Sequence, residues 1–215
     1  MPRRARVLID GGIYLILTRG NNGQTIFHQD ADHQRYLHLL FGYAQRYHLH
    51  LHHFVLMPNH VHLVLSVVVA AKLSKAMLGL NLAYALFYRK RYRYHGHLWQ
   101  GRFHSVLIDR GSALLECGRH IELNPVRAGL VQDPDAYSWS SYRAYAHGAH
   151  DPLIVPNPLY ELLGVTPSER QARYRQFVRE GLQPAHAPEP LHPYSFMEGT
   201  TKQNRGRPKK ILTLP

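Results

Sequence analysis

Two histidines one residue apart are the first candidates for chemistry in this chain. His60 and His62 follow a Pro-Asn turn and open an apolar, strand-like run. Side chains alternate across a strand, so both imidazoles would face one side while Val61 points into the core. Such a pair supplies half of a metal site. The competing interpretation is chance, because the chain has 17 histidines and the same spacing recurs at positions 50 and 52.

A second candidate is the run from His120 to Arg127. On a helix, His120 and Asn124 are four residues apart and share a face. Arg127 follows the expected helix end, where it could reach a phosphate. The alternative is structural, because Asn124 before a proline is also an ordinary helix terminator.

Aromatic and basic residues cluster in two further segments. Trp99 and Arg102 open an expected strand, and the alternative role for Trp99 is that of a buried anchor for the sheet. Cations interleave with tyrosines near position 90, which suits phosphate contacts and base stacking or, alternatively, a solvated helix end whose cations favour the helix dipole. The cations of this second segment are Arg89, Lys90, Arg91 and Arg93.

Composition points to a polyanionic partner. Lys+Arg 26 against Asp+Glu 14 gives a net charge of +12, and the sequence pI is near 10.0, which favours nucleic acid first and acidic membrane second. The single cysteine, Cys117, excludes a disulfide scaffold and a cysteine-built zinc site. No apolar stretch reaches ~18 residues and no signal core follows the N-terminus. We therefore expect a soluble, cytoplasmic protein that does not enter membranes.

The order of elements predicts an α+β fold. Strands are expected at 11–19, 49–57, 60–68 and 102–109, and helices at 30–47, 71–93 and 112–124. This β-α-β-β-α-β-α order is the ferredoxin-like, split βαβ arrangement, an antiparallel sheet with helices on one face. Two short helices are expected at 137–147 and 168–181.

Three units are expected along the chain. Residues 1–148 would form the main α+β domain, 149–183 a helical C-terminal extension, and 184–215 a flexible basic tail. Arg205 and Arg207 lie in a Gly-Arg-Pro context that could enter an A·T-rich minor groove. A tail that only raises non-specific affinity is the alternative.

Four motifs in this order and spacing resemble the REP-associated tyrosine transposases, a branch of the single-tyrosine HUH transposases. The resemblance covers about residues 3–145 and is specific because the motifs occur jointly. Their segments are Gly12-Ile13-Tyr14 with Thr18-Arg19-Gly20-Asn21-Asn22, then Met57-Pro58-Asn59-His60-Val61-His62-Leu63, Trp99-Gln100-Gly101-Arg102-Phe103, and Ile121-Glu122-Leu123-Asn124-Pro125-Val126-Arg127-Ala128-Gly129.

The resemblance implies a single-strand DNA endonuclease and strand transferase that acts on repetitive extragenic palindromes. It implies that His60, His62 and Asn124 hold a divalent metal. This mixed N/O donor set suits Mg²⁺ or Mn²⁺, which would polarise a phosphoryl oxygen for attack by a tyrosine hydroxyl. Hairpin or single-stranded DNA is the expected partner and a homodimer is possible. Residues expected to grip the DNA also include Arg3, Arg4, Arg19, Asn21 and Asn22.

The chain departs from the family pattern at the nucleophile. That position, four residues before Asn124, is His120 rather than a tyrosine. Three explanations compete: a chain that binds metal and DNA without forming a phosphotyrosine, attack by His120 itself, or a displaced tyrosine. His120 could also join the metal shell, leaving water as the nucleophile. The tyrosines considered for this role are Tyr137, Tyr142 and Tyr145.

The leading functional hypothesis is a transposase that binds a REP-like hairpin and performs metal-dependent cleavage and strand transfer, with its activity dependent on position 120. The alternative is a non-catalytic hairpin-binding protein, either domesticated or inactivated.

Overall fold

The computed structural model describes residues 8–108 and 112–183. Four strands form one antiparallel sheet in the order β2-β3-β1-β4. The expected ferredoxin-like order of elements is confirmed. The strands are β1 (Ile13–Arg19), β2 (Leu49–Met57), β3 (His60–Val67) and β4 (His104–Ile108).

The helices lie close to their expected positions. The first three are α1 (Asp30–Tyr47), α2 (Ala70–Tyr92) and α3 (Ser112–Glu122). The others are α4 (Asn124–Arg127), α5 (Tyr142–His147) and α6 (Pro167–Glu180), with short 3-10 turns at Asn21–Gly23, Pro134–Ala136 and Glu161–Leu163. No helix in the described ranges is both long and apolar enough to cross a membrane.

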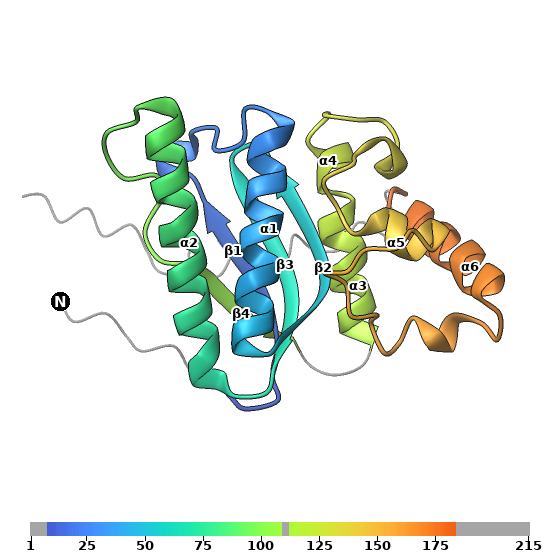
Figure 1. Ribbon diagram of the computed structural model, residues 1–215. Helices are drawn as coiled ribbons and strands as arrows, with labels where there is room; N and C mark the ends of the chain where they lie inside the picture. Colours follow the sequence, from blue (N-terminus) through green and yellow to red (C-terminus); the bar gives the residue numbers. More distant parts are fainter. Residues whose placement is uncertain (1–7, 109–111, 184–215) are drawn as a thin grey trace, which may run out of the picture.

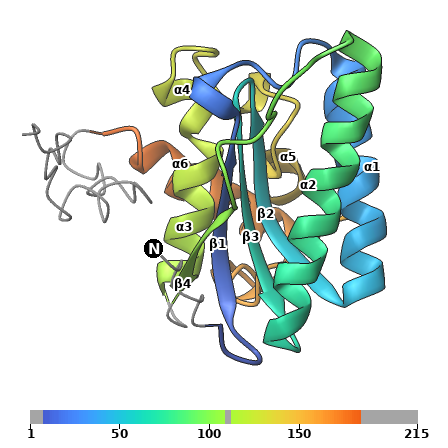
Figure 2. The ribbon, with the colours of Figure 1, turned by 90° about the vertical axis from the view of Figure 1, so that its left-hand side faces the viewer.

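The sequence predicted that all the helices lie on one face of the sheet. The structure places helices on both faces. Helices α1 and α2 cover one face, and α3 covers the other (Figures 1 and 2). The reason is that β2 and β3 are buried on both faces, so a second apolar layer is needed. That layer joins Val55 and Val64 of the sheet to Cys117 and Ile121 of α3.

A β-bulge in β2 changes which residues face α3. The register shifts between Leu51 and His53. Before the bulge, Leu51 packs in the core under α1 and α2; after it, Phe54 does so, and Val55 packs under α3. The extra residue therefore re-aims the second half of the strand. As a result His53, which pairs with Val64, points toward α3.

The residues after α4 fold back against the core rather than away from it. Isolated bridges join Leu51 to Ile154 and Val55 to Ser140, and α5 and α6 form a third apolar cluster with Leu123. These contacts join residues on both sides of position 148, and the division of the chain into units at that residue stays a prediction. The third predicted unit, residues 184–215, lies outside the described residues.

Candidate metal and DNA-binding site

The paired histidines lie together at the start of β3. The ring centroids of His60 and His62 are 5.0 Å apart at 79°. His62 pairs with Val55, and Val55 packs under α3. Cross-strand partners share a face, so both imidazoles point to the α3 side of the sheet. His62 is 6% exposed, whereas His60 is half-buried, so the pair spans the boundary between core and solvent.

Hydrogen bonds to Asn59 fix the tautomer of His60. The Asn59 amide nitrogen donates to the carbonyl of Gly23 at 3.1 Å, so its Oδ1 is the acceptor for His60 Nδ1 at 2.6 Å. His60 Nδ1 therefore carries the proton, and the lone pair of the neutral ring is on Nε2. A metal-ligating histidine is usually oriented in this way, by a hydrogen bond from its other ring nitrogen.

Three of the four motifs meet at this end of the sheet. Arg19 is the cross-strand partner of His60, which places it on the same face. The Gly20 N–H donates to the Asn59 carbonyl at 2.8 Å, and the Gln100 N–H donates to the Arg19 carbonyl at 2.9 Å. The Asn21 N–H donates to the Leu98 carbonyl at 2.8 Å. The turn that holds Asn21 and Asn22 is thereby tied to both the histidine turn and the Trp99 segment.

The fourth motif reaches the same end through α3 and α4. Both ribbon views show α4 beside the end of β2, where β3 begins (Figures 1 and 2). Helix α3 ends at Glu122, two residues earlier than expected, and α4 restarts at Asn124 with a proline in its first turn. The Asn124 Nδ2 atom is buried and makes no hydrogen bond to any described residue. Asn124 is thus a polar group in need of a partner, on a helix that lies beside the end of β2 where β3 begins (Figure 1).

His120 is held by Arg127. The guanidinium Nη1 lies 3.0 Å from His120 Nδ1 and 3.3 Å from the His120 carbonyl oxygen. An arginine can only donate, so Nδ1 accepts and the neutral imidazole carries its proton on Nε2. In this arrangement, Nε2 of His120 is a hydrogen-bond donor.

Glu122, between His120 and Asn124, fixes the end of α3. This fully buried carboxylate accepts from His53 Nδ1 at 2.9 Å, Ser141 Oγ at 2.5 Å and Tyr174 OH at 2.6 Å. Asn157 Nδ2 lies 3.1 Å from His53 Nε2 and donates to it, because Oδ1 of Asn157 is occupied by a backbone N–H. His53 is therefore held at both ring nitrogens, between Glu122 and Asn157.

Sequence reasoning missed two residues here. Glu122 lies within the fourth motif, but its hydrogen-bond partners are 19 to 69 residues away in the chain, so local sequence gives it no role. His104 of β4 pairs with Leu17, which also pairs with His62, so His104 lies on the histidine face of the sheet. No spacing in the sequence marks either residue.

The three candidate tyrosines are held in the structure. Tyr137 donates to the Leu56 carbonyl at 2.6 Å, and Tyr145 donates to the His52 carbonyl at 2.7 Å. Burial raises the pKa of Tyr137 and of Tyr142 to about 12, and raises that of Tyr145 further. Attack by one of them would need a buried phenol to leave its site and lose its proton.

The predicted basic residues are differently placed. Arg91 forms an ion pair with the buried carboxylate of Asp32 at 3.2 Å and donates to Gln29 at 2.7 Å, so it has a structural role. Its neighbours Arg89, Lys90 and Arg93 are exposed at the end of α2. Four other arginines predicted to bind DNA lie outside the described residues: Arg3, Arg4, Arg205 and Arg207.

Among the described residues, no group of three or more His, Cys, Asp or Glu side chains could hold a metal ion. A divalent ion at the histidine pair would therefore need a further ligand of a different kind, such as an amide oxygen. The amide of Asn124, with its buried and unsatisfied nitrogen, fits that need, because the two ends of an amide are assigned by their hydrogen bonds and not by shape.

Comparisons with known proteins identify a family and a shared fold. A family model described as "Transposase IS200 like" matches residues 11–121. One similar solved structure is a REP-associated tyrosine transposase bound to a REP hairpin, with 16% identity, 73% of this chain and 93% of that chain covered, and a TM-score of 0.55; it shows a shared fold. A second is a putative transposase from Deinococcus radiodurans, with 20% identity, coverage of 61% and 94%, and a TM-score of 0.36. No curated protein sequence matches the chain.

Proposed function

The chain belongs to the IS200-like transposase family, and from that premise we propose that it binds a REP-like DNA hairpin with a single-stranded flank and holds a divalent metal beside it. The metal ligands are His60, His62 and the Asn124 amide oxygen, and the ion is Mg²⁺ or Mn²⁺. The observation that carries this proposal is the convergence of the two imidazoles, with the tautomer of His60 fixed by Asn59.

The donor set determines what the site can do. Two neutral imidazoles and an amide leave the full charge of a bound cation available to a phosphate, where it would polarise a phosphoryl oxygen. Arg19 lies beside His60 on the same face and adds a cation for the DNA backbone. His120, with a proton on Nε2, can donate a hydrogen bond to a phosphate oxygen.

The contact between Arg127 and His120 favours the second candidate function, a hairpin-binding protein that forms no covalent DNA link. The residue at the nucleophile position has one ring nitrogen occupied by the arginine and the other protonated. We therefore expect tight hairpin binding by this chain and no adduct at position 120.

The test uses a labelled oligonucleotide with a hairpin and a single-stranded flank, incubated with Mn²⁺ and run on a denaturing gel. We expect the unchanged chain to bind it without an adduct, and His120→Tyr to form one. His120→Phe is the matched control, because it differs from His120→Tyr only by the hydroxyl group. Adding His60→Ala or a chelator to His120→Tyr should abolish the adduct while hairpin binding persists.

Two results would contradict the proposal. An acid-labile adduct of the unchanged chain, lost in His120→Phe, would show that the imidazole attacks phosphorus. Equal affinity for the hairpin and for a scrambled single strand would remove hairpin recognition altogether.

A further inference from the structure

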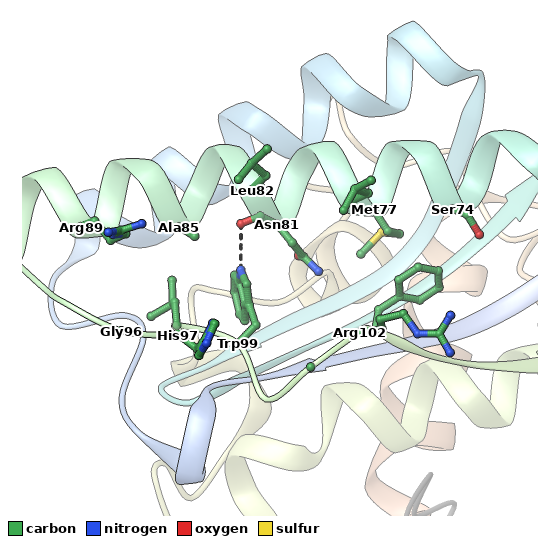
Figure 3. A pocket seen from close by; sticks show the side chains of 14 residues that line it. Ser74, Met77, Asn81, Leu82, Ala85, Arg89, Gly96, His97, Trp99 and Arg102 are labelled. Atoms are coloured by element: carbon green, nitrogen blue, oxygen red, sulfur yellow. Dashed lines mark hydrogen bonds between the residues drawn. The ribbon is translucent and has the colours of Figure 1, made fainter. Parts of the chain in front are cut away.

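A pocket lies between α2 and the segment that leads into β4. Its volume is about 500 Å³, and it lies on the α2 side of the sheet, opposite the face that carries the histidine pair. The walls are largely apolar and include Met77, Leu82, Trp99 and Phe103 (Figure 3). None of the three proposed metal ligands lines this pocket.

One polar side chain points into this pocket without a partner. Asn81 is 9% exposed and lines the pocket, and its Oδ1 makes no hydrogen bond to any described residue. Figure 3 shows the amide directed into the space between α2 and Arg102. A buried amide without a partner is costly, so this atom calls for a ligand that offers a hydrogen bond.

Trp99 is fixed in the pocket wall. Its Nε1 donates to the backbone carbonyl of Asn81 at 2.8 Å, and its ring lies 5.8 Å from that of Tyr84. The ring therefore cannot turn away without losing a hydrogen bond. A rigid indole beside an amide is suited to a flat, polar-edged ligand.

The rim combines exposed apolar and cationic side chains. Leu78 and Leu82 are 71% and 57% exposed, and the exposed residues Arg89 and Arg102 also line the pocket. An apolar peptide would match the leucines but would leave the buried Oδ1 of Asn81 without a hydrogen-bond donor.

The pocket is joined to the metal site by a short path. The Gln100 N–H donates to the carbonyl of Arg19, and Arg19 pairs with His60 on the other face of the sheet. Because the pocket and the histidine pair lie at the same end of β1, one strand that rounds this end can occupy both.

We propose that this pocket binds one unpaired nucleobase of the DNA strand whose backbone reaches His60 and His62. The base stacks on Trp99, its edge exchanges hydrogen bonds with the Asn81 amide, and the flanking phosphates contact Arg89 and Arg102. The proposal rests on the proposed function. A nucleobase is the ligand class that uses every group present, because each base has an aromatic face and adjacent donors and acceptors on its edge.

The experiment is an abasic scan with the full chain. Each unpaired nucleotide of the hairpin substrate is replaced in turn by an abasic site, and affinity is measured by fluorescence anisotropy. We expect one position to lose about tenfold or more in affinity, the range for a lost stacked base. Asn81→Leu should weaken binding of the complete oligonucleotide and show no further loss at that abasic position.

A pair of surface variants avoids any risk to the fold. Leu82 and Leu86 are 57% and 56% exposed on the same helix, but only Leu82 lines the pocket. We expect Leu82→Gln to weaken binding of the complete oligonucleotide and to leave the critical abasic one unchanged, whereas Leu86→Gln leaves both unchanged.

Several outcomes separate this inference from the proposed function. A flat abasic scan with normal hairpin affinity would overturn the nucleobase pocket alone. A flat scan in which Leu82→Gln changes the oligomeric state would assign the pocket to a second copy of this chain, and would also overturn the inference. Absence of hairpin binding by the unchanged chain would refute the proposed function itself.

Discussion

Replacing Glu122 with alanine should unfold this protein at a much lower temperature. Glu122 is fully buried and accepts three hydrogen bonds, from His53, Ser141 and Tyr174. Each buried donor left without an acceptor costs about 1–3 kcal/mol, so removing the shared acceptor of three donors should cost at least about 3 kcal/mol, and we take a range of about 3–5 kcal/mol. For a chain of this size, each kcal/mol lowers the melting temperature by about 2–4 °C. The expected decrease for Glu122→Ala is therefore about 6–20 °C.

Calorimetry of Glu122→Ala and Glu161→Ala measures this effect. Glu161 is exposed, so its replacement should change stability by about 0.5 kcal/mol or less. Glu122→Gln keeps the shape but places an amide N–H₂ among donors, and it should fall between the two. Equal melting temperatures for Glu122→Ala and Glu161→Ala would refute the assignment of Glu122 as the anchor of α3.

The remaining predictions concern the whole protein. Burial lowers the pKa of His52 from 6.5 to about 4, so the unfolded chain binds more protons between these pH values and stability falls as the pH drops from 6.5 to 4. Urea titrations at pH 7 and pH 5 should show a smaller loss in His52→Gln, and equal losses would contradict this. Hairpin affinity should fall steeply with salt; a flat response would exclude the phosphate contacts. Burial raises the pKa of the Cys117 thiol to about 12, so rapid labelling of the native protein by a thiol reagent would contradict its burial.

Local patterns in the sequence predicted most of the fold. The turn at Pro58-Asn59 and the alternation of His60 and His62 were visible because strand periodicity and turn chemistry act between near neighbours. The shared face of the two histidines was confirmed by the pairing of β3 with β2 and β1. Their role as metal ligands stays a prediction.

Features set by distant contacts could not be predicted in this way. The bulge at Leu51/His53 turns His53 toward α3, where its partner Glu122 lies 69 residues away in the chain. The second helical layer covers the other face of β2 and β3. A run of apolar residues in the sequence does not tell whether one face or both faces of a strand are covered. The protonated nitrogen of His120 depends on Arg127, a contact that helix periodicity alone does not reveal.

The return of the chain along β2 has a consequence for solubility. A strand at the border of a sheet offers unpaired N–H and C=O groups to other molecules, and proteins cover such borders to avoid aggregation. Here the Leu56 N–H donates to Trp139 and the Val155 N–H donates to Leu51, so the segment around residues 139–155 occupies that border. A chain shortened before this segment would expose the border of β2 to strand pairing between molecules. We therefore expect that a fragment needs this segment as well as the ferredoxin-like core to stay free of aggregation.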